Sequence, residues 1–304
     1  MPATHSGDGS ASARPSPELR QMLSDAALLT LGENQRRMTV PVSINGEGPY
    51  PFVIDTGAER TVISRQLATV LGLKSGPRVT LAAMSGRQVV GTYVVPELSV
   101  ERLSDFAGLA APGLDKYDLG AHGLLGLDVL EGHLIRFDFA RREMSVRDSP
   151  RRRVLRHSSD EIVVTARRYH HRLVLTDAEY RGHAIRVLID TGSVISVGNP
   201  AFQRLVERSR SIANPLTVLS VTGDRVEAQL SLVDGVKIGS VRYKSLPVAF
   251  SPQPPFDTFA PGDRPVLILG MDALRIFSQV DIDFTNSRIV FHMPDPDYVP
   301  PVWW

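Results

Sequence analysis

An internal repeat constrains the fold of this chain more than any other feature of its 304 residues. The run Pro51–Ala58 (PFVIDTGA) returns as Arg186–Ser193 (RVLIDTGS), with aspartates 190 − 55 = 135 residues apart. Two later blocks return in the same order: Gly123–Asp128 as Leu267–Asp272, and Ile135–Phe139 as Val280–Phe284. Their offsets are 270 − 126 = 144 and 283 − 138 = 145 residues. Because the order is kept and the offset drifts by only ten residues, the sequence predicts two copies of one structural unit.

Each copy is predicted to consist of strands with few, short helices. A β-branched and apolar run over residues 38–44 ends at Asn45-Gly46, a strong hairpin signal. Ser64 can cap a short helix in the first copy, and Asn199 with Pro200 can begin one in the second. The fold class is therefore all-β, with two homologous β-barrel-like lobes, short helices, and a functional site where the lobes meet.

The repeat and the composition together predict the domain layout. Five segments follow one another: a leader over 1–37, partly disordered with a short helix; an N-terminal lobe over 38–146; a linker over 147–160; a C-terminal lobe over 161–293; and a tail over 294–304. The leader is rich in Ser, Gly, Ala and Pro, and the linker is rich in arginine. The late-strand aspartates Asp138 and Asp283 are predicted to face solvent or to cap turns.

Composition excludes several classes of function. The net charge is +1, so no overall field attracts nucleic acid, and no nucleic-acid partner is expected. The chain has no cysteine, which excludes disulfides and thiolate metal sites. The eight histidines show no metal spacing, and the adjacent His170 and His171 would point to opposite faces of a strand. We expect no metal and no cofactor.

No membrane-spanning segment is predicted, since no apolar run approaches the roughly 18–20 residues that a spanning helix needs. The run Ala26–Leu31 is also too short for the core of a signal peptide. The compartment therefore stays open from these features alone.

The repeated tripeptide Asp-Thr-Gly has a chemical logic. Asp55 and Asp190 each follow an apolar strand, so each carboxylate leaves a sheet where its surroundings can be fixed. The following glycines, Gly57 and Gly192, permit close approach of the backbone. One such tripeptide is usually a turn, but two copies in matching contexts indicate paired carboxylates.

These motifs resemble those of the retropepsin-like and pepsin-like aspartic proteases. The resemblance rests on Asp55-Thr56-Gly57-Ala58 with Leu124-Leu125-Gly126, and on Asp190-Thr191-Gly192-Ser193 with Ile268-Leu269-Gly270. It covers about Met38 to Met293, and the arrangement is similar to two fused retropepsin-like units, as in the bacterial group that includes PerP-type periplasmic proteases. That group implies the periplasm if the start is truncated; otherwise the cytoplasm is expected.

The resemblance implies an aspartic endopeptidase, which hydrolyses peptide bonds of protein substrates without a cofactor. Asp55 and Asp190 would share one proton and activate a water molecule between them. Thr56 and Thr191 would link the two motifs, and the two apolar-apolar-Gly segments would pack behind the aspartate loops. Hairpins would close over the substrate as flaps: Met84-Ser85-Gly86 in the first copy and Val221-Thr222-Gly223 in the second.

Two other interpretations remain open. The chain could be a catalytically silent peptide-binding protein of the same fold, or each lobe could pair with another chain. The internal pairing favours a protein that functions as a monomer.

One difference between the copies and one feature that they share lead to further hypotheses. Ala58 is matched by Ser193, whose hydroxyl would favour the charged form of Asp190. Two long loops, Asp105–Ala121 and Ser251–Pro265, precede the apolar-apolar-Gly segments, and we expect them to shape the substrate cleft.

Overall fold

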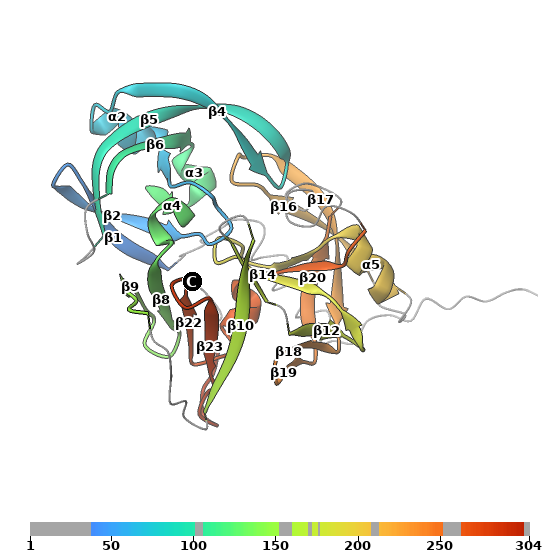
Figure 1. Ribbon diagram of the computed structural model, residues 1–304. Helices are drawn as coiled ribbons and strands as arrows, with labels where there is room; N and C mark the ends of the chain where they lie inside the picture. The colour runs from blue at the N-terminus through green and yellow to red at the C-terminus, as the bar shows by residue number, and fades with distance from the viewer. Residues whose placement is uncertain are drawn as a thin grey trace, which may run out of the picture.

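The computed structural model describes residues 38–100, 106–151, 160–169, 172–175, 177–207, 213–251 and 263–300. The predicted leader, His170-His171 and the last four residues of the predicted tail lie outside these ranges, as does most of the predicted linker. Strands dominate the described part, and the helices are short, as Figure 1 shows. The predicted all-β fold is confirmed.

A seven-stranded sheet contains the first Asp-Thr-Gly motif. Its order is β1-β2-β7-β3-β6-β5-β4, and β1 also pairs with β5, so the sheet curls toward a barrel. The strands are β1 (Thr39–Ile44), β2 (Glu47–Ile54), β3 (Val62–Ser64), β4 (Ser75–Ala83), β5 (Gly86–Val100), β6 (Phe106–Leu114) and β7 (Gly123–Leu125). The helices are α2 (Arg65–Val70), α3 (Lys116–Leu119) and α4 (Leu127–Leu130).

Local sequence explains how these elements begin and end. Asn45 and Gly46 have φ values of 52° and 75°, which suit the two-residue turn between β1 and β2. The Ser64 hydroxyl accepts a hydrogen bond from the Leu67 amide and caps α2. In the second copy, the Asn199 side chain accepts from the Phe202 amide at the start of α5 (Pro200–Glu207). The predicted capping residues are confirmed.

The second motif lies in a twelve-stranded sheet of order β16-β17-β20-β15-β21-β14-β11-β10-β23-β22-β8-β9. Its strands are β8 (His133–Asp138), β9 (Glu143–Asp148), β10 (Glu161–Tyr169), β11 (Arg172–Leu175), β14 (Arg186–Ile189), β15 (Ser196–Gly198), β16 (Ala213–Leu219), β17 (Arg225–Val233), β20 (Leu246–Phe250), β21 (Val266–Leu269), β22 (Gln279–Asp283) and β23 (Arg288–His292). A four-stranded sheet contains β12 (Ala178–Tyr180), β13 (His183–Ala184), β18 (Val236–Ile238) and β19 (Val241–Tyr243). Helix α7 spans Met271–Leu274.

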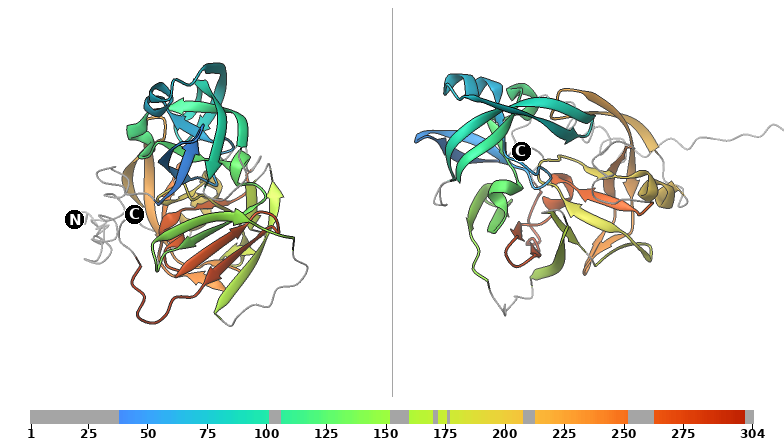
Figure 2. Two further views of the ribbon diagram at one scale, coloured as in Figure 1. Left: turned by 90° about the vertical axis from the view of Figure 1, so that its left-hand side faces the viewer. Right: turned by 45° about the horizontal axis from the view of Figure 1, so that its top comes forward.

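The two copies are joined through this sheet. Strand β8, from the end of the first copy, pairs antiparallel with β22 of the second, and Figure 2 shows these strands in one layer beneath the first barrel. Opposite each other in this pairing, Arg136 donates two hydrogen bonds of 2.8 and 2.7 Å to the carboxylate of Asp281. The domain boundaries stay a prediction, but the copies are hydrogen-bonded to each other along a strand edge.

The late-strand aspartates are buried. Asp138 accepts a hydrogen bond from the Arg141 amide, and Asp283 accepts one from the Asn286 amide, so each caps the turn after its strand. Their side chains do not face solvent, because Asp138 is 8% exposed and Asp283 1%. The capping half of the prediction is confirmed and the solvent-facing half is wrong.

The main hydrophobic core is continuous between the copies. Phe137 and Phe139 of the first copy belong to the same buried cluster as Phe284 and Phe291 of the second. None of the helices in the described ranges is long and apolar enough to cross a membrane.

The Arg136–Asp281 pair should contribute to the stability of the junction. Removing the guanidinium in Arg136→Ala leaves a largely buried carboxylate without its main partner, so we expect the free energy of unfolding to fall by about 2–3 kcal/mol in urea titrations. Arg141→Ala is the control, because Arg141 pairs with Asp138 but is itself exposed. This substitution should lower the free energy of unfolding by less than about 1 kcal/mol. Equal losses in the two variants would contradict the special role of the junction pair.

Candidate active site

The two Asp-Thr-Gly motifs meet at the junction of the copies. Asp55 follows the end of β2, which runs parallel to β7, and Asp190 follows the end of β14, which runs parallel to β21. The amide of each aspartate donates to the last residue of the parallel neighbour, Leu125 or Leu269, over 3.0 Å. Both aspartates are thus fixed at the ends of paired, buried strands.

The threonines tie the two motifs together. The Thr56 amide donates to Oγ1 of Thr191, and the Thr191 amide donates to Oγ1 of Thr56, each over 3.2 Å. Each hydroxyl then donates over 2.8 Å to a carbonyl of the other copy: Thr56 to Ile189, and Thr191 to Ile54. These four hydrogen bonds are buried, so they hold the loops in one relative position.

The glycines bring the carboxyl groups close to the opposite loop. A Cβ atom on Gly57 would lie 2.6 Å from the Asp190 carboxyl carbon, and one on Gly192 would lie 2.3 Å from that of Asp55. No side chain fits into such spaces, which explains why both positions are glycine. Each glycine amide also donates over 2.9 Å to the aspartate of its own motif.

The site favours one proton shared between the carboxyls. Burial raises the pKa of Asp190 to about 7, and the nearby Asp55 charge adds to the rise; the Gly192 amide and Arg172 act in the opposite direction. Two carboxylates this close repel each other, so below about pH 7 one of them keeps its proton.

The hypothesis about Ser193 is wrong. Its hydroxyl donates a 2.7 Å hydrogen bond to the carbonyl of Ile195, so the hydroxyl proton is directed away from the Asp190 carboxylate. Ser193 donates to Asp190 through its amide, over 3.2 Å, and the Ala58 amide makes the same bond to Asp55 over 3.0 Å. The difference between Ala58 and Ser193 therefore does not decide which aspartate is charged.

The apolar-apolar-Gly segments lie behind the aspartate loops. A Cβ on Gly126 would lie 2.4 Å from the Arg60 carbonyl carbon, and one on Gly270 would lie 2.7 Å from that of Ile195. Leu124 and Ile268 face the cavity, whereas Leu125 and Leu269 join the main core. The leucine and isoleucine side chains thus alternate between the site and its support.

Sequence reasoning gave no role to the aspartates that follow these segments, although they repeat. In the first copy, Oγ1 of Thr61 accepts from the Gly126 amide and donates to Asp128. In the second copy, Oγ of Ser196 accepts a hydrogen bond from the Gly270 amide and donates one to Asp272. Burial raises the pKa of Asp272 to about 6. Asp128 and Asp272 each lie two residues after the glycine of their segment, and this repeated spacing was the signal that both copies share the same hydrogen-bonded support.

The two predicted flaps are hairpins whose tips cross to the other copy. Met84, at the β4–β5 turn, packs on an apolar cluster of the second copy with Val197 and Ile268, and Val221 packs on one of the first copy with Leu114 and Leu124. Between the tips, the Ser85 and Thr222 hydroxyls are 2.8 Å apart and hydrogen-bonded. Gly223 is needed at its turn because its φ is 86°.

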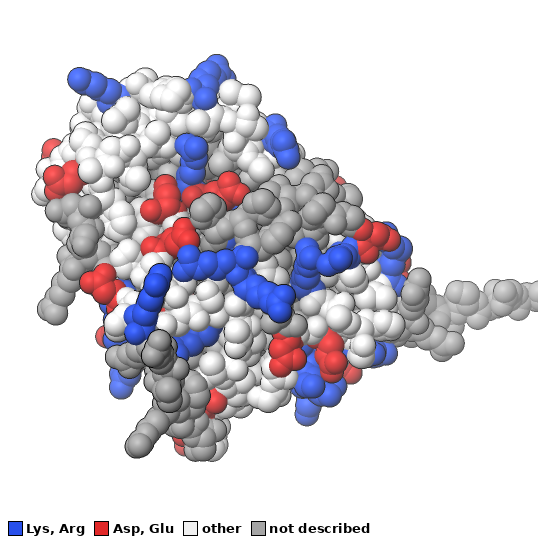
Figure 3. All heavy atoms as spheres, viewed as in Figure 1, with Lys and Arg blue, Asp and Glu red and all other residues white. Residues whose placement is uncertain are grey.

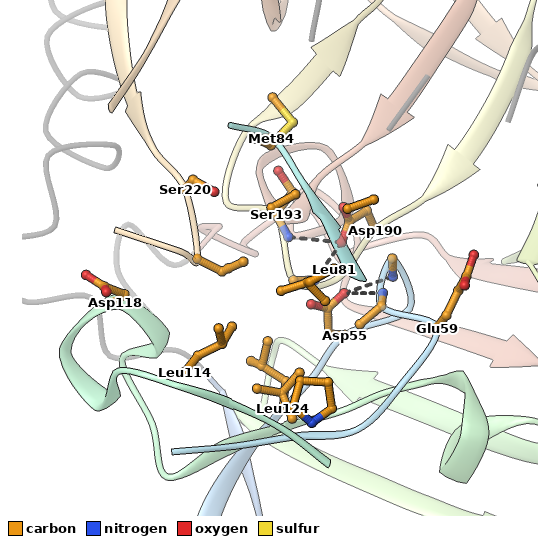
Figure 4. Close-up of a pocket in the computed structure, with 18 of the residues that line it drawn as sticks. Asp55, Glu59, Leu81, Met84, Leu114, Asp118, Leu124, Asp190, Ser193 and Ser220 are labelled. Carbon is orange, nitrogen blue, oxygen red and sulfur yellow. Dashed lines mark hydrogen bonds between the residues drawn. The ribbon is translucent and has the colours of Figure 1, made fainter. Parts of the chain in front are cut away.

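A cavity of about 420 Å³ lies between the flaps and the aspartates, and Figure 4 shows Asp55 and Asp190 at its wall. The predicted site residues that line it are Asp55, Gly57, Ala58, Met84, Leu124, Asp190, Gly192, Ser193, Val221 and Ile268. The other predicted residues surround it. Thr56 and Thr191 join the loops, Leu125, Gly126, Leu269 and Gly270 pack beneath the loops, and Ser85, Gly86, Thr222 and Gly223 form the flap tips.

One buried cation at this site was missed. Arg172 is 7% exposed and crosses from β11 to the first motif, where it donates to the Gly57 carbonyl over 2.6 Å and to Glu59 over 2.9 Å. A signal was present in the repeat, because the 135-residue offset places Arg37 at the matching position, 172 − 135 = 37. Arg37 lies outside the described residues.

The first of the two predicted cleft loops does line the cavity, but it is not a loop. Its residues form strand β6 and helix α3, from which Pro112, Leu114, Tyr117, Asp118 and Gly120 face the cavity. Most of the second predicted loop, residues 252–262, lies outside the described residues. Within the described ranges, no three His, Cys, Asp or Glu side chains gather in a way that could hold a metal ion.

Comparison with protein families agrees with this geometry. The family described as gag-polyprotein putative aspartyl protease matches residues 40–132, and the family described as aspartyl protease matches residues 176–273. No curated protein matches the chain. The chain belongs to the retropepsin-like aspartic proteases, in a form that carries two aspartyl protease domains in tandem. The two domains support a protease-type function.

The raised pKa of Asp190 has a consequence for stability. Below about pH 4, the carboxyl is protonated in both the folded and unfolded chain, and its burial carries no ionic cost. As pH rises from about 4 to 7 the unfolded chain loses this proton first, so stability falls and stays lowered above pH 7. Asp190→Asn has no charge to desolvate and should raise the Tm at pH 8 on the order of 5 °C, with little change at pH 3.5.

Calorimetry at both pH values checks this expectation. Asp234→Asn is the matched control, since Asp234 is exposed, and its Tm should stay near that of the wild type. A gain of equal size at pH 3.5 and pH 8 would contradict a raised pKa at Asp190.

Proposed function

We propose that this protein is an aspartic endopeptidase that uses Asp55 and Asp190 to hydrolyse peptide bonds within protein chains. The observation that carries the proposal is the reciprocal packing of the two carboxyl groups. Each lies against the glycine of the other motif, at the wall of a cavity that an extended peptide can enter. Both aspartates come from one chain, which supports action as a monomer.

In the proposed reaction, the ionised aspartate takes a proton from a water molecule that attacks the scissile carbonyl carbon. The protonated aspartate donates a hydrogen bond to the carbonyl oxygen, which gains negative charge as the tetrahedral intermediate forms. A pair that keeps one proton up to about pH 7 provides both roles at once.

Breakdown of the intermediate returns the carboxyls to their starting state. The scissile nitrogen accepts a proton from an aspartate, the C–N bond breaks, and the products are a new carboxyl terminus and a new amine. Water and the two carboxyls supply every proton that moves, so the proposed reaction needs no other group.

The surrounding structure supports these roles by fixing geometry. The bonds between Thr56 and Thr191 set the spacing of the loops, and Arg172 holds the Gly57 carbonyl. A positional error of a fraction of an ångström at reacting groups costs rate, which gives these buried contacts a purpose.

The substrate would lie beneath the two flaps. Their hairpins β4–β5 and β16–β17 cross over the cavity, whose walls near the aspartates are apolar, with Leu81, Leu124 and Ile268 among them. An extended peptide fits such a site by strand-like hydrogen bonds to the hairpins and by apolar side chains in the cavity.

Loss of either carboxyl should abolish hydrolysis. Asp55→Asn and Asp190→Asn should each lower kcat on an unfolded protein such as casein by at least about 1,000-fold, because Asn cannot transfer the proton. Internal cleavage sites are identified by mass spectrometry of the fragments, with the exposed Asp234→Asn as an active control. If the wild type releases no fragments between pH 4 and 8, the peptide-binding alternative replaces the proposal.

The pH dependence should follow the shared proton. Activity should decline as pH rises through about 7, because the pair then loses its remaining proton and no acid is left to polarise the carbonyl. Since the Arg172 charge lowers the pKa of Asp190, Arg172→Met should move this alkaline limb to higher pH. A limb that stays at the same pH in the variant would contradict the assigned electrostatic effect.

A further inference from the structure

The cavity contains charged side chains besides the two aspartates, and most of them are accounted for. Glu59 receives a hydrogen bond from Arg172, so the acidic group beside the first motif is neutralised. Arg60, the next residue, is exposed at the edge. Asp118, on α3, lines the cavity and makes no side-chain hydrogen bond or ion pair with any residue in the ranges that the structure describes.

The cationic groups Arg65 and Lys116 each have another partner. Arg65 pairs with Asp115, which also accepts a hydrogen bond from Gln66. The Lys116 amine is hydrogen-bonded to His122 and does not line the cavity. Burial raises the pKa of Asp118, and the nearby charges of Asp115 and Asp224 add to the rise. The Arg65 charge acts in the opposite direction, but Arg65 forms its ion pair with Asp115.

The neighbouring side chain is an exposed aromatic ring. Tyr117 is 91% exposed and lines the same cavity, so its ring is available to a ligand at the mouth. The helix that carries both residues is held in place: Asp115 caps it, Leu119 is fully buried, and the Lys116 amide donates to Gln66. Tyr117 and Asp118 are therefore presented on a fixed support.

The position of α3 relative to the flap tip matters for substrate entry. A Cβ on Gly223 would lie 2.8 Å from the Asp118 carboxylate, so the carboxylate lies directly beside the tip of the second flap. In Figure 4, Asp118 and Glu59 lie on opposite sides of the catalytic pair. A peptide that leaves the cavity on the α3 side passes both Tyr117 and Asp118, which line the cavity there.

We propose that Tyr117 and Asp118 form a subsite for a cationic side chain, arginine or lysine, of the peptide substrate. A carboxylate and an aromatic face together bind a guanidinium better than either does alone, since one accepts its hydrogen bonds and the other stacks on its plane. This inference rests on the proposed function and names its substrate class: an apolar sequence at the scissile bond with a basic residue on one side.

The preference acts on one side because the far end of the cavity differs. There, Glu59 is paired with Arg172, and Arg60 adds a positive charge. A cationic side chain of the substrate therefore gains no binding free energy at that end. The face of the molecule shown in Figure 3 has acidic and basic side chains interspersed, and no single sign dominates it. Selection for a basic residue therefore depends on the local subsite and not on an overall field.

Binding is tested first, because it does not require turnover. The probe is a set of fluorescent decapeptides with a central Leu-Phe pair and one arginine placed at each flanking position in turn. Neutral citrulline replaces that arginine in a matched set. With Asp190→Asn as the binding protein, fluorescence anisotropy should show roughly tenfold tighter binding of arginine than of citrulline at one position, on one side only.

Variants then assign the preference to the subsite. In the Asp190→Asn background, Asp118→Asn should remove the difference between arginine and citrulline, and Asp118→Lys should make glutamate the preferred residue at that position. Tyr117→Ala should weaken arginine more than lysine, since only the guanidinium stacks. Glu97→Gln is the control, because Glu97 is exposed on β5 and does not line the cavity; its arginine preference should match that of the parent.

The results separate this inference from the proposed function. Equal binding of arginine and citrulline at every position, or an arginine preference that persists in Asp118→Asn, would overturn the subsite. Arginine-selective binding together with a wild type that cleaves none of these peptides would keep the subsite and reject the endopeptidase.

Discussion

The hydrogen bonds between Thr56 and Thr191 connect two loops whose aspartates would otherwise belong to separate sites. Because each threonine hydroxyl also donates to a carbonyl of the opposite copy, the loops are fixed in position as well as joined. The close approach that results leaves no room for a Cβ at Gly57 or Gly192. It also places two acidic groups where they repel, and this repulsion, added to burial, is what keeps a proton at the site.

The rest of the fold maintains this contact from several directions. Behind the loops, Gly126 and Gly270 allow the supporting segments to touch the backbone at Arg60 and Ile195. Below them, β8 of the first copy continues the sheet of the second, so the copies cannot separate without breaking strand pairing. Above them, the flap tip of each copy packs on an apolar cluster of the other copy. The proposed catalytic centre is therefore enclosed by contacts between the copies on every level.

The two copies are nevertheless not equivalent at the cavity. Glu59 follows the first motif and is bound by Arg172, whereas the matching residue of the second motif is the apolar Val194. Only the first copy, among the described residues, presents Tyr117 and Asp118 to the cavity. A symmetric catalytic pair within an asymmetric cavity provides a physical basis for binding a peptide in one direction, because its two ends meet different charges.

The sequence by itself determined the strands, the caps and the paired Asp-Thr-Gly loops, since turn residues, apolar runs and a repeat are local patterns. Strict glycines at positions 57 and 192 were also predictable, although their cause, the opposite carboxyl group, was not. Tertiary structure alone decided that β8 pairs with β22, that Arg172 reaches Glu59, and that the Ser193 hydroxyl faces Ile195. These contacts join residues up to 283 − 134 = 149 positions apart, or depend on side-chain direction, and no local pattern specifies either.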